Sequence, residues 1–150
     1  MSDFLIIEAR FYEDLADELV RGASGALKER GHSFERIAVP GVLEVPGALA
    51  MALAAAQKGS LRAYDGYVLL GCVIRGETSH YDIVANESAR VVMELVARHG
   101  LALGNGILTV ENAAQAWARA GVEAKNKGAT AAAAACDMLE LKKRWGLAAG

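Results

Sequence analysis

The sequence predicts an α/β fold in which helices cover both faces of a four-stranded parallel sheet. Short apolar runs alternate along the chain with longer segments of helical periodicity, in the order βαβαβαβαα. One run, YVLLGCVI at residues 67–74, is continuously apolar, which is typical of a central parallel strand buried on both faces. Glycines and prolines fall between these segments, where turns and helix ends are expected.

The first half of the chain contains two strand–helix pairs. FLIIEA at residues 4–9 is the first expected strand, and residues 13–30 repeat apolar side chains at helical spacing until Gly31. Residues 34–39 alternate in polarity and stop at Pro40, which predicts the second strand. Pro46 can open the next helix, because the first turn of a helix leaves its N–H groups unpaired anyway. Gly59 is the expected end of that helix.

The second half begins with the strand at residues 67–74 and a helix over residues 80–99. A fourth strand is expected at residues 106–110, then a short helix at residues 112–120 and a last helix at residues 130–145. We expect residues 1–150 to form one domain. In open parallel sheets, ligands bind outside the carboxyl ends of the strands, so the loops that follow the strands are the candidates for a site.

Composition excludes several classes of function. A net charge of -2 without a basic block argues against nucleic-acid binding. The apolar runs are too short to span a membrane, and the N-terminal residues do not resemble a signal peptide. Cys72 and Cys136 lie within apolar segments and are expected to be buried free thiols of a cytoplasmic protein. The cysteines and histidines lack the spacing of metal ligands, so no metal site is expected.

The loop after the third expected strand, RGETSH at residues 75–80, gathers the most polar groups. Gly76 permits a tight turn, Thr78 and Ser79 are good N-caps, and the helix N-terminus favours an anion such as phosphate. His80 can exchange protons near neutral pH. The alternative is a capped helix whose histidine is merely solvated.

The other loops offer weaker signals, each with a structural alternative. Phe11 can stack on a ring ligand or fold into the core. Glu44, between two proline–glycine pairs, can help to bind a heterocycle or interact only with the helix dipole. Arg119 suits bidentate phosphate binding. With Lys125 and Lys127 it can equally form a solvated, helix-terminal cluster of charges.

Read as a set, these loops resemble one enzyme family. PGVLEVPGA, GCVIRGETSHYDIVANES, NGILTVENAAQAWARAG and NKG, in this order, resemble the lumazine synthases (6,7-dimethyl-8-ribityllumazine synthases) of riboflavin biosynthesis. The resemblance implies a flavodoxin-like three-layer sandwich. It implies a transferase that condenses 5-amino-6-(D-ribitylamino)uracil with 3,4-dihydroxy-2-butanone 4-phosphate, releasing phosphate and water. It implies no cofactor and no metal.

The resemblance also implies a role for particular residues. His80 would be the catalytic proton donor and acceptor, and Glu77, Thr78 and Arg119 would hold the butanone phosphate, with Lys127 nearby. The ribitylaminouracil would be bound by Phe11, Val42, Leu43, Glu44, Cys72, Val73, Ile74 and Asn105. In the family, the residues at positions 105, 119 and 127 reach the site from a neighbouring subunit of a homopentamer or larger assembly.

Three positions depart from the common family pattern. Asn105 stands where many relatives have phenylalanine, Tyr12 where asparagine is common, and Leu43 where an aromatic residue is frequent. Two other readings of the sequence therefore accompany the enzyme. One is a flavin- or lumazine-binding protein of the same fold with little turnover, and the other is a structural assembly whose shell is its function.

Overall fold

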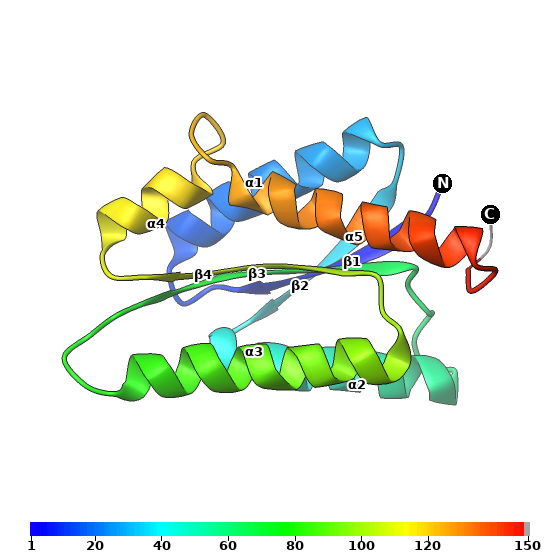
Figure 1. Cartoon of the computed structure of the whole chain (residues 1–150), viewed down its shortest axis with the longest axis horizontal. Coiled ribbons are helices and arrows are strands. Elements are labelled where there is room, and N and C mark those ends of the chain that lie inside the picture. The colour runs from blue at the N-terminus through cyan, green and yellow to red at the C-terminus, as the bar shows by residue number, and fades with distance from the viewer. Residues whose placement is uncertain (149–150) are drawn as a thin grey trace.

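A four-stranded parallel sheet forms the centre of the molecule in a computed structural model that describes residues 1–148 (Figure 1). The strands are β1 (Asp3–Ala9), β2 (Ser33–Val39), β3 (Gly66–Ile74) and β4 (Leu103–Val110), in the spatial order β2-β1-β3-β4. All three strand pairs are parallel. The central strands β1 and β3 are buried on both faces, as the apolar run of β3 predicts.

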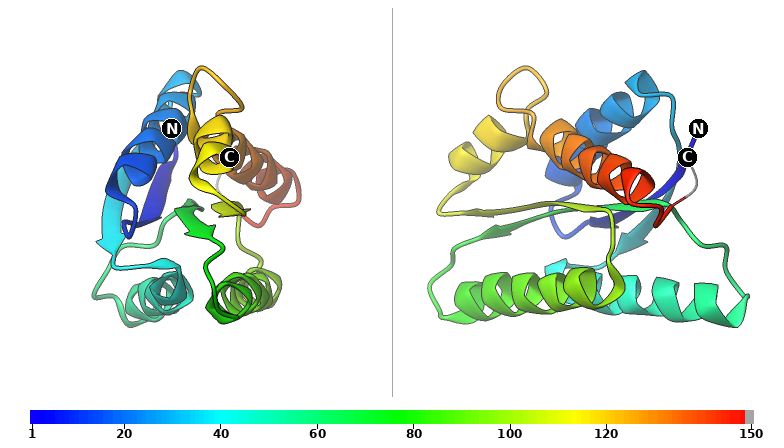
Figure 2. Two further views of the ribbon diagram at one scale, coloured as in Figure 1. Left: turned by 90° about the vertical axis from the view of Figure 1, so that its left-hand side faces the viewer. Right: turned by 45° about the vertical axis from the view of Figure 1, so that its right-hand side comes forward.

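Helices cover both faces of the sheet and complete three layers. α1 (Glu13–Glu29), α4 (Ala113–Ala120) and α5 (Lys127–Arg144) lie on one face, and α2 (Val45–Lys58) and α3 (His80–His99) lie on the other (Figure 2). Alternate residues of β1 serve the two cores: Phe4 and Ile6 face α1 and α5, whereas Leu5 and Ile7 face α2 and α3. This arrangement confirms the predicted α/β class and the flavodoxin-like three-layer sandwich.

Two element boundaries were predicted wrongly. β4 begins at Leu103 rather than at residue 106, because Gly104 and Asn105 pair in register with Val68 and Leu69 of β3. Gly104 lets the strand lie close under α5, because a Cβ at this position would collide with the Ala131 carbonyl. α5 begins at Lys127 rather than at residue 130. Its N-cap is Asn126, whose side chain accepts a hydrogen bond from the Ala129 amide.

Smaller differences occur at other helix ends. A short 3-10 helix, η1 (Val42–Glu44), precedes α2, and Pro46 lies in the first turn of α2 as expected. α2 ends at Gly59, which adopts a left-handed conformation (φ 85°) that glycine tolerates without strain. Within residues 1–148, none of the helices has the length and apolar character needed to cross a membrane.

Candidate active site

A pocket of about 420 Å³ lies at the carboxyl edge of the sheet, where open parallel sheets bind ligands. The loops after β1, β2 and β3 and the start of α3 supply its walls. Its lining residues, which define the carboxyl-edge pocket, are Phe11, Tyr12, Gly41, Val42, Leu43, Glu44, Cys72, Val73, Ile74, Gly76, Thr78, His80, Tyr81 and Val84. Nine of the predicted site residues are among them, contributed by segments far apart in the sequence.

The apolar part of this pocket presents exposed side chains. Phe11 is 73% exposed and Leu43 is 43% exposed, so of the two alternatives for Phe11 the structure excludes a position in the core. The Phe11 ring meets the Tyr12 ring edge-on, with 4.9 Å between centroids and 82° between planes. Val42, the neighbour of Leu43 in η1, is buried. A flat heterocycle could therefore lie against Phe11 with aliphatic side chains around it.

Two ionisable groups of the pocket wall are held neutral. Burial raises the pKa of the Cys72 thiol to about 11, so the thiol stays protonated at neutral pH. Burial also raises the pKa of Tyr12, and the nearby Cys72 adds to the effect. Both side chains therefore line the pocket without charge, which suits an uncharged ring system.

The polar turn before α3 is arranged differently from the prediction in one respect. Ser79 occupies the N-cap position of α3, but its side chain makes no capping hydrogen bond. Thr78 takes this role in part, because its hydroxyl oxygen accepts a 3.3 Å hydrogen bond from the His80 amide. His80 is the first residue of α3, is exposed, and lines the pocket. Glu77 is also exposed but is not among the lining residues.

Arg75 joins this turn to the loop after β4, a connection that sequence reasoning missed. Its guanidinium lies 2.9 Å from a carboxylate oxygen of Glu111 and 3.6 Å from Asp82, and stacks 4.2 Å from the centre of the Tyr81 ring. Its amide also donates a hydrogen bond to the Val110 carbonyl. Glu111 is 36 residues away in sequence, so this contact becomes visible only once β3 and β4 are known to be neighbours.

The remaining predicted residues gather in a second pocket of about 350 Å³, the β4–α5 pocket. It is lined by Asn105, Gly106, Ile107, Leu108, Thr109, Arg119, Lys127, Thr130, Ala131 and Ala134. Arg119 is half-buried and donates a 3.1 Å hydrogen bond to the Gln115 carbonyl, whereas Lys127 is exposed. Lys125, predicted as part of the same basic cluster, is not among the lining residues.

The structure thus divides the predicted site residues into two groups. Within residues 1–148, the two pockets share no lining residue. His80 lies in one pocket, and Arg119 and Lys127 lie in the other. The residues that line the carboxyl-edge pocket include neither lysine nor arginine, so this pocket by itself has no side-chain cation for a phosphate.

The described part of the chain, residues 1–148, also contains no group of three or more histidine, cysteine, aspartate or glutamate side chains that could hold a metal ion. Several pocket residues were not singled out from the sequence as ligand contacts: Tyr12, Tyr81, Val84, Thr109 and Thr130. Tyr12 had a visible signal, because it directly follows Phe11 in the same loop.

Comparison with known proteins places the chain in a family. The family model described as 6,7-dimethyl-8-ribityllumazine synthase matches residues 2–143. The chain is 58% identical to "6,7-dimethyl-8-ribityllumazine synthase 1" of Rhizobium meliloti (strain 1021) over 142 residues, covering 95% of this chain and 92% of the relative. It is 57% identical to the 6,7-dimethyl-8-ribityllumazine synthase of Novosphingobium aromaticivorans over 145 residues, covering 97% and 99% of the two chains. With a family match across almost its whole length and relatives of this similarity, the chain belongs to the 6,7-dimethyl-8-ribityllumazine synthase family.

Proposed function

We propose that this transferase condenses 5-amino-6-(D-ribitylamino)uracil with 3,4-dihydroxy-2-butanone 4-phosphate at a site shared between two copies of the chain. The products are 6,7-dimethyl-8-ribityllumazine, phosphate and water. One observation carries the shared site: His80 and Arg119 line separate pockets, and among residues 1–148 no lysine or arginine lines the carboxyl-edge pocket. A neighbouring chain can supply that cation from its β4–α5 pocket.

The carboxyl-edge pocket binds the ribitylaminouracil. Phe11 stacks on the pyrimidine, because its ring is more exposed than those of Tyr12 and Tyr81, the other aromatic residues of this pocket. Val42, Leu43 and Glu44 border the ring from η1, and the end of β3 closes the pocket with Cys72, Val73 and Ile74. Asn105 of the neighbouring chain completes this half of the site.

The turn before α3 binds the butanone phosphate. The N-terminus of α3 carries a partial positive charge, and the hydroxyl of Thr78 and the backbone at Glu77 lie beside it. Arg119 of the neighbouring chain grips the phosphate, and Lys127 adds a second positive charge. These donors stabilise the negative charge that grows on the phosphate as it leaves.

His80 moves the protons. The 5-amino group of the uracil attacks the ketone carbon, and a C–N bond forms as the carbonyl π electrons move to oxygen. His80 delivers a proton to that oxygen and accepts one from the nitrogen, which gives a carbinolamine. A second transfer of the same kind, again from nitrogen to oxygen, releases the hydroxyl as water and leaves an imine. Loss of phosphate and ring closure follow, and both benefit from holding the two substrates together. The chemistry requires no cofactor.

The assembly is a homopentamer or a larger homo-oligomer of one-domain chains, working in the cytoplasm. Exposed apolar side chains support association. They lie on α2, α3, α4 and α5, and they are Met51, Ile83, Met93, Trp117 and Met138. Apolar side chains spread over so many helices favour burial against further copies of the chain.

The first test measures lumazine formation optically with the purified protein, against the uncatalysed reaction. We expect His80→Ala to lower kcat by about 100-fold, the lower end of what a positioned acid–base group contributes, because proton transfer is lost while positioning remains. Arg119→Ala should raise KM for the butanone phosphate. Tight lumazine binding without turnover by the wild-type protein would favour the binding-protein reading. Unchanged turnover in both variants would refute the site.

A second test addresses the shared site. Phe11→Ala chains and Arg119→Ala chains are mixed, dissociated and reassembled. If each site takes one pocket from each of two chains, about a quarter of the sites in an equal mixture are intact, because the two lesions fall at random on either side of the interface. Mass spectrometry shows whether mixed oligomers have formed. If they have and the activity stays at the level of the separate variants, the site is not shared between chains.

A further inference from the structure

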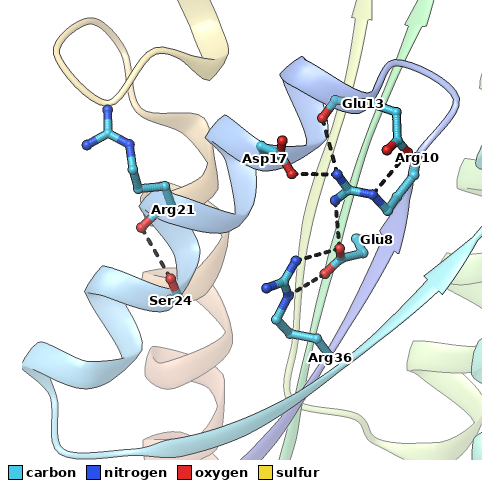
Figure 3. Close-up of polar contacts among 7 residues, drawn as sticks. All are labelled: Glu8, Arg10, Glu13, Asp17, Arg21, Ser24 and Arg36. Atoms are coloured by element: carbon cyan, nitrogen blue, oxygen red, sulfur yellow. Dashed lines mark hydrogen bonds and ion pairs between the residues drawn. The ribbon is translucent and has the colours of Figure 1, made fainter.

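A buried carboxylate lies at the carboxyl end of β1, directly before the loop that carries Phe11. Glu8 is 2% exposed, and its two oxygens are fully engaged by arginines (Figure 3). Arg36 of β2 donates two hydrogen bonds of 2.8 Å to them, and Arg10 donates a third, also of 2.8 Å. Such bidentate, charge-assisted bonds hold their partners in a defined orientation.

Arg10 extends this network to the first turns of α1. Its guanidinium donates to the Asp17 carboxylate at 2.5 Å and to the Glu13 carboxylate at 3.1 Å, as well as to the Glu8 carboxylate (Figure 3). The Arg10 amide also donates a 3.0 Å hydrogen bond to the Val39 carbonyl at the end of β2. The hydrogen bond that Arg10 donates to Asp17 contributes most to raising the pKa of Arg10, so the guanidinium is fully charged. Arg10 therefore ties β1, β2 and α1 together at one point.

Phe11 follows Arg10 directly and has little support of its own. It is 73% exposed, and its recorded ring contact is the edge-on packing with its neighbour Tyr12. Residues 10–12 connect β1 to α1 without regular structure, and the chain bends at Phe11 and Tyr12. The place of the Phe11 ring is therefore set by the backbone of this short loop, and Arg10 fixes that backbone at both ends.

A role in stability alone does not account for the network. Buried ion pairs often contribute little net stability compared with apolar residues of similar size, because removing charges from water is costly. The five charged side chains of the network instead hold the ends of β1 and β2 and the start of α1 in a fixed arrangement. That geometry is needed at this loop because it carries the proposed stacking ring.

We propose that Arg10 is a positioning residue for the pyrimidine-binding half of the site, acting through Phe11. This inference rests on the proposed function, in which Phe11 stacks on the ribitylaminouracil. The rigid loop keeps the ring in its stacking position before the substrate arrives, so less ordering is needed on binding. The phosphate-binding turn before α3 belongs to a different loop and does not depend on this network.

The test compares steady-state kinetics of Arg10→Ala and wild type for both substrates. We expect KM for the ribitylaminouracil to rise about tenfold, equivalent to about 1.4 kcal/mol, while KM for the butanone phosphate changes less than about twofold. Arg21→Ala is the matched control, since Arg21 lies on the same α1 but away from the loop (Figure 3). Its guanidinium pairs with Glu18. Equal increases in both KM values for Arg10→Ala would overturn the proposal.

A second variant, at the exposed end of the network, tests the proposal even if Arg10→Ala misfolds. Asp17→Asn removes the carboxylate charge beside Arg10 but leaves the buried bonds between Glu8 and Arg36 in place. We expect a smaller rise of the same kind, about two- to threefold, with an unchanged melting temperature. An unchanged KM for the ribitylaminouracil in Asp17→Asn and in a folded Arg10→Ala would overturn the proposal.

The double variant Arg10→Ala/Phe11→Ala separates this inference from the proposed function. If Arg10 acts through Phe11, the double variant has the same pyrimidine KM as Phe11→Ala alone. If the two effects multiply, Arg10 acts independently and the inference fails while the proposed function stands. If Phe11→Ala leaves the pyrimidine KM unchanged, the proposed ring-stacking role itself is wrong.

Discussion

Gly104→Ala tests whether the close approach of β4 to α5 is required for the β4–α5 pocket. A Cβ added at Gly104 would lie 1.7 Å from the Ala131 carbonyl oxygen and 2.6 Å from the carbonyl carbon. Ordinary van der Waals contacts of a Cβ lie at 3.4–4 Å. The obstructing atoms belong to the backbone of α5, so no side-chain rotation can relieve the clash. The helix must move away from the strand by more than about 1 Å.

The magnitude follows from the rigidity of both partners. Overpacking a core typically costs about 1–3 kcal/mol of stability. We expect a cost at the upper end of this range, because the clash involves the backbones of both β4 and α5. Replacing glycine within a strand returns about 0.5–1 kcal/mol through the unfolded chain. We therefore expect the free energy of unfolding to fall by about 2 kcal/mol. That corresponds to a melting temperature about 4–8 °C lower for a chain of this size.

Urea denaturation followed by circular dichroism, at one fixed protein concentration, measures the change. Gly25→Ala in α1 is the matched control, because its added Cβ meets nothing within 4 Å. That control should be as stable as wild type or more stable by up to about 1 kcal/mol, since alanine favours the helix. Gly104→Ala should also raise KM for the butanone phosphate, because α5 carries Lys127 and Thr130. Wild-type stability in Gly104→Ala would refute the reasoning.

Two further predictions concern pH. Burial raises the pKa of Cys72 from 9.0 to about 11, so its contribution to stability is present below pH 9 and is lost as pH rises to about 11. Wild type should lose up to about 3 kcal/mol more than Cys72→Ala over this interval in chemical denaturation, and parallel pH curves would contradict the prediction. Burial, Lys143 and the N-terminal amine lower the pKa of His32, whose Nδ1 accepts a hydrogen bond from the Ser2 amide. Protonation therefore costs more in the folded state, and wild type should lose stability below about pH 6.5 more steeply than His32→Asn does. If His32→Asn lost stability at acid pH more steeply than wild type, this account would be refuted.

Local sequence signals gave the wrong start for β4 and α5, where contacts between distant segments determine the backbone conformation. The expected start of the fourth strand was late because LGNG has the composition of a turn, whereas its glycines serve the approach of α5. The expected start of the last helix was late because Asn126 adopts a left-handed conformation (φ 47°) and caps α5 from there. Neither feature follows from hydrophobic periodicity, which reports burial and not the packing distance between elements.

The sequence identified candidate site residues by their chemistry, and the tertiary structure decided which of them lie in the same pocket. The polar turn at residues 75–80 was visible because glycine, hydroxyl groups and a histidine adjoin a helix start. The network around Glu8 was not visible, because Arg36 meets Glu8 only through the parallel register of β1 and β2. The link between Arg75 and Glu111 likewise depends on β3 and β4 being neighbours.

By itself, the sequence determined the α/β class, the order of the elements and the loops that carry the chemistry. These follow from hydrophobic periodicity and turn residues, which act over a few positions along the chain. Only the tertiary structure decided the strand order β2-β1-β3-β4 and the separation of His80 from Arg119 into different pockets. Strand order and pocket walls depend on contacts between segments tens of residues apart, and no local pattern specifies which of those segments will meet.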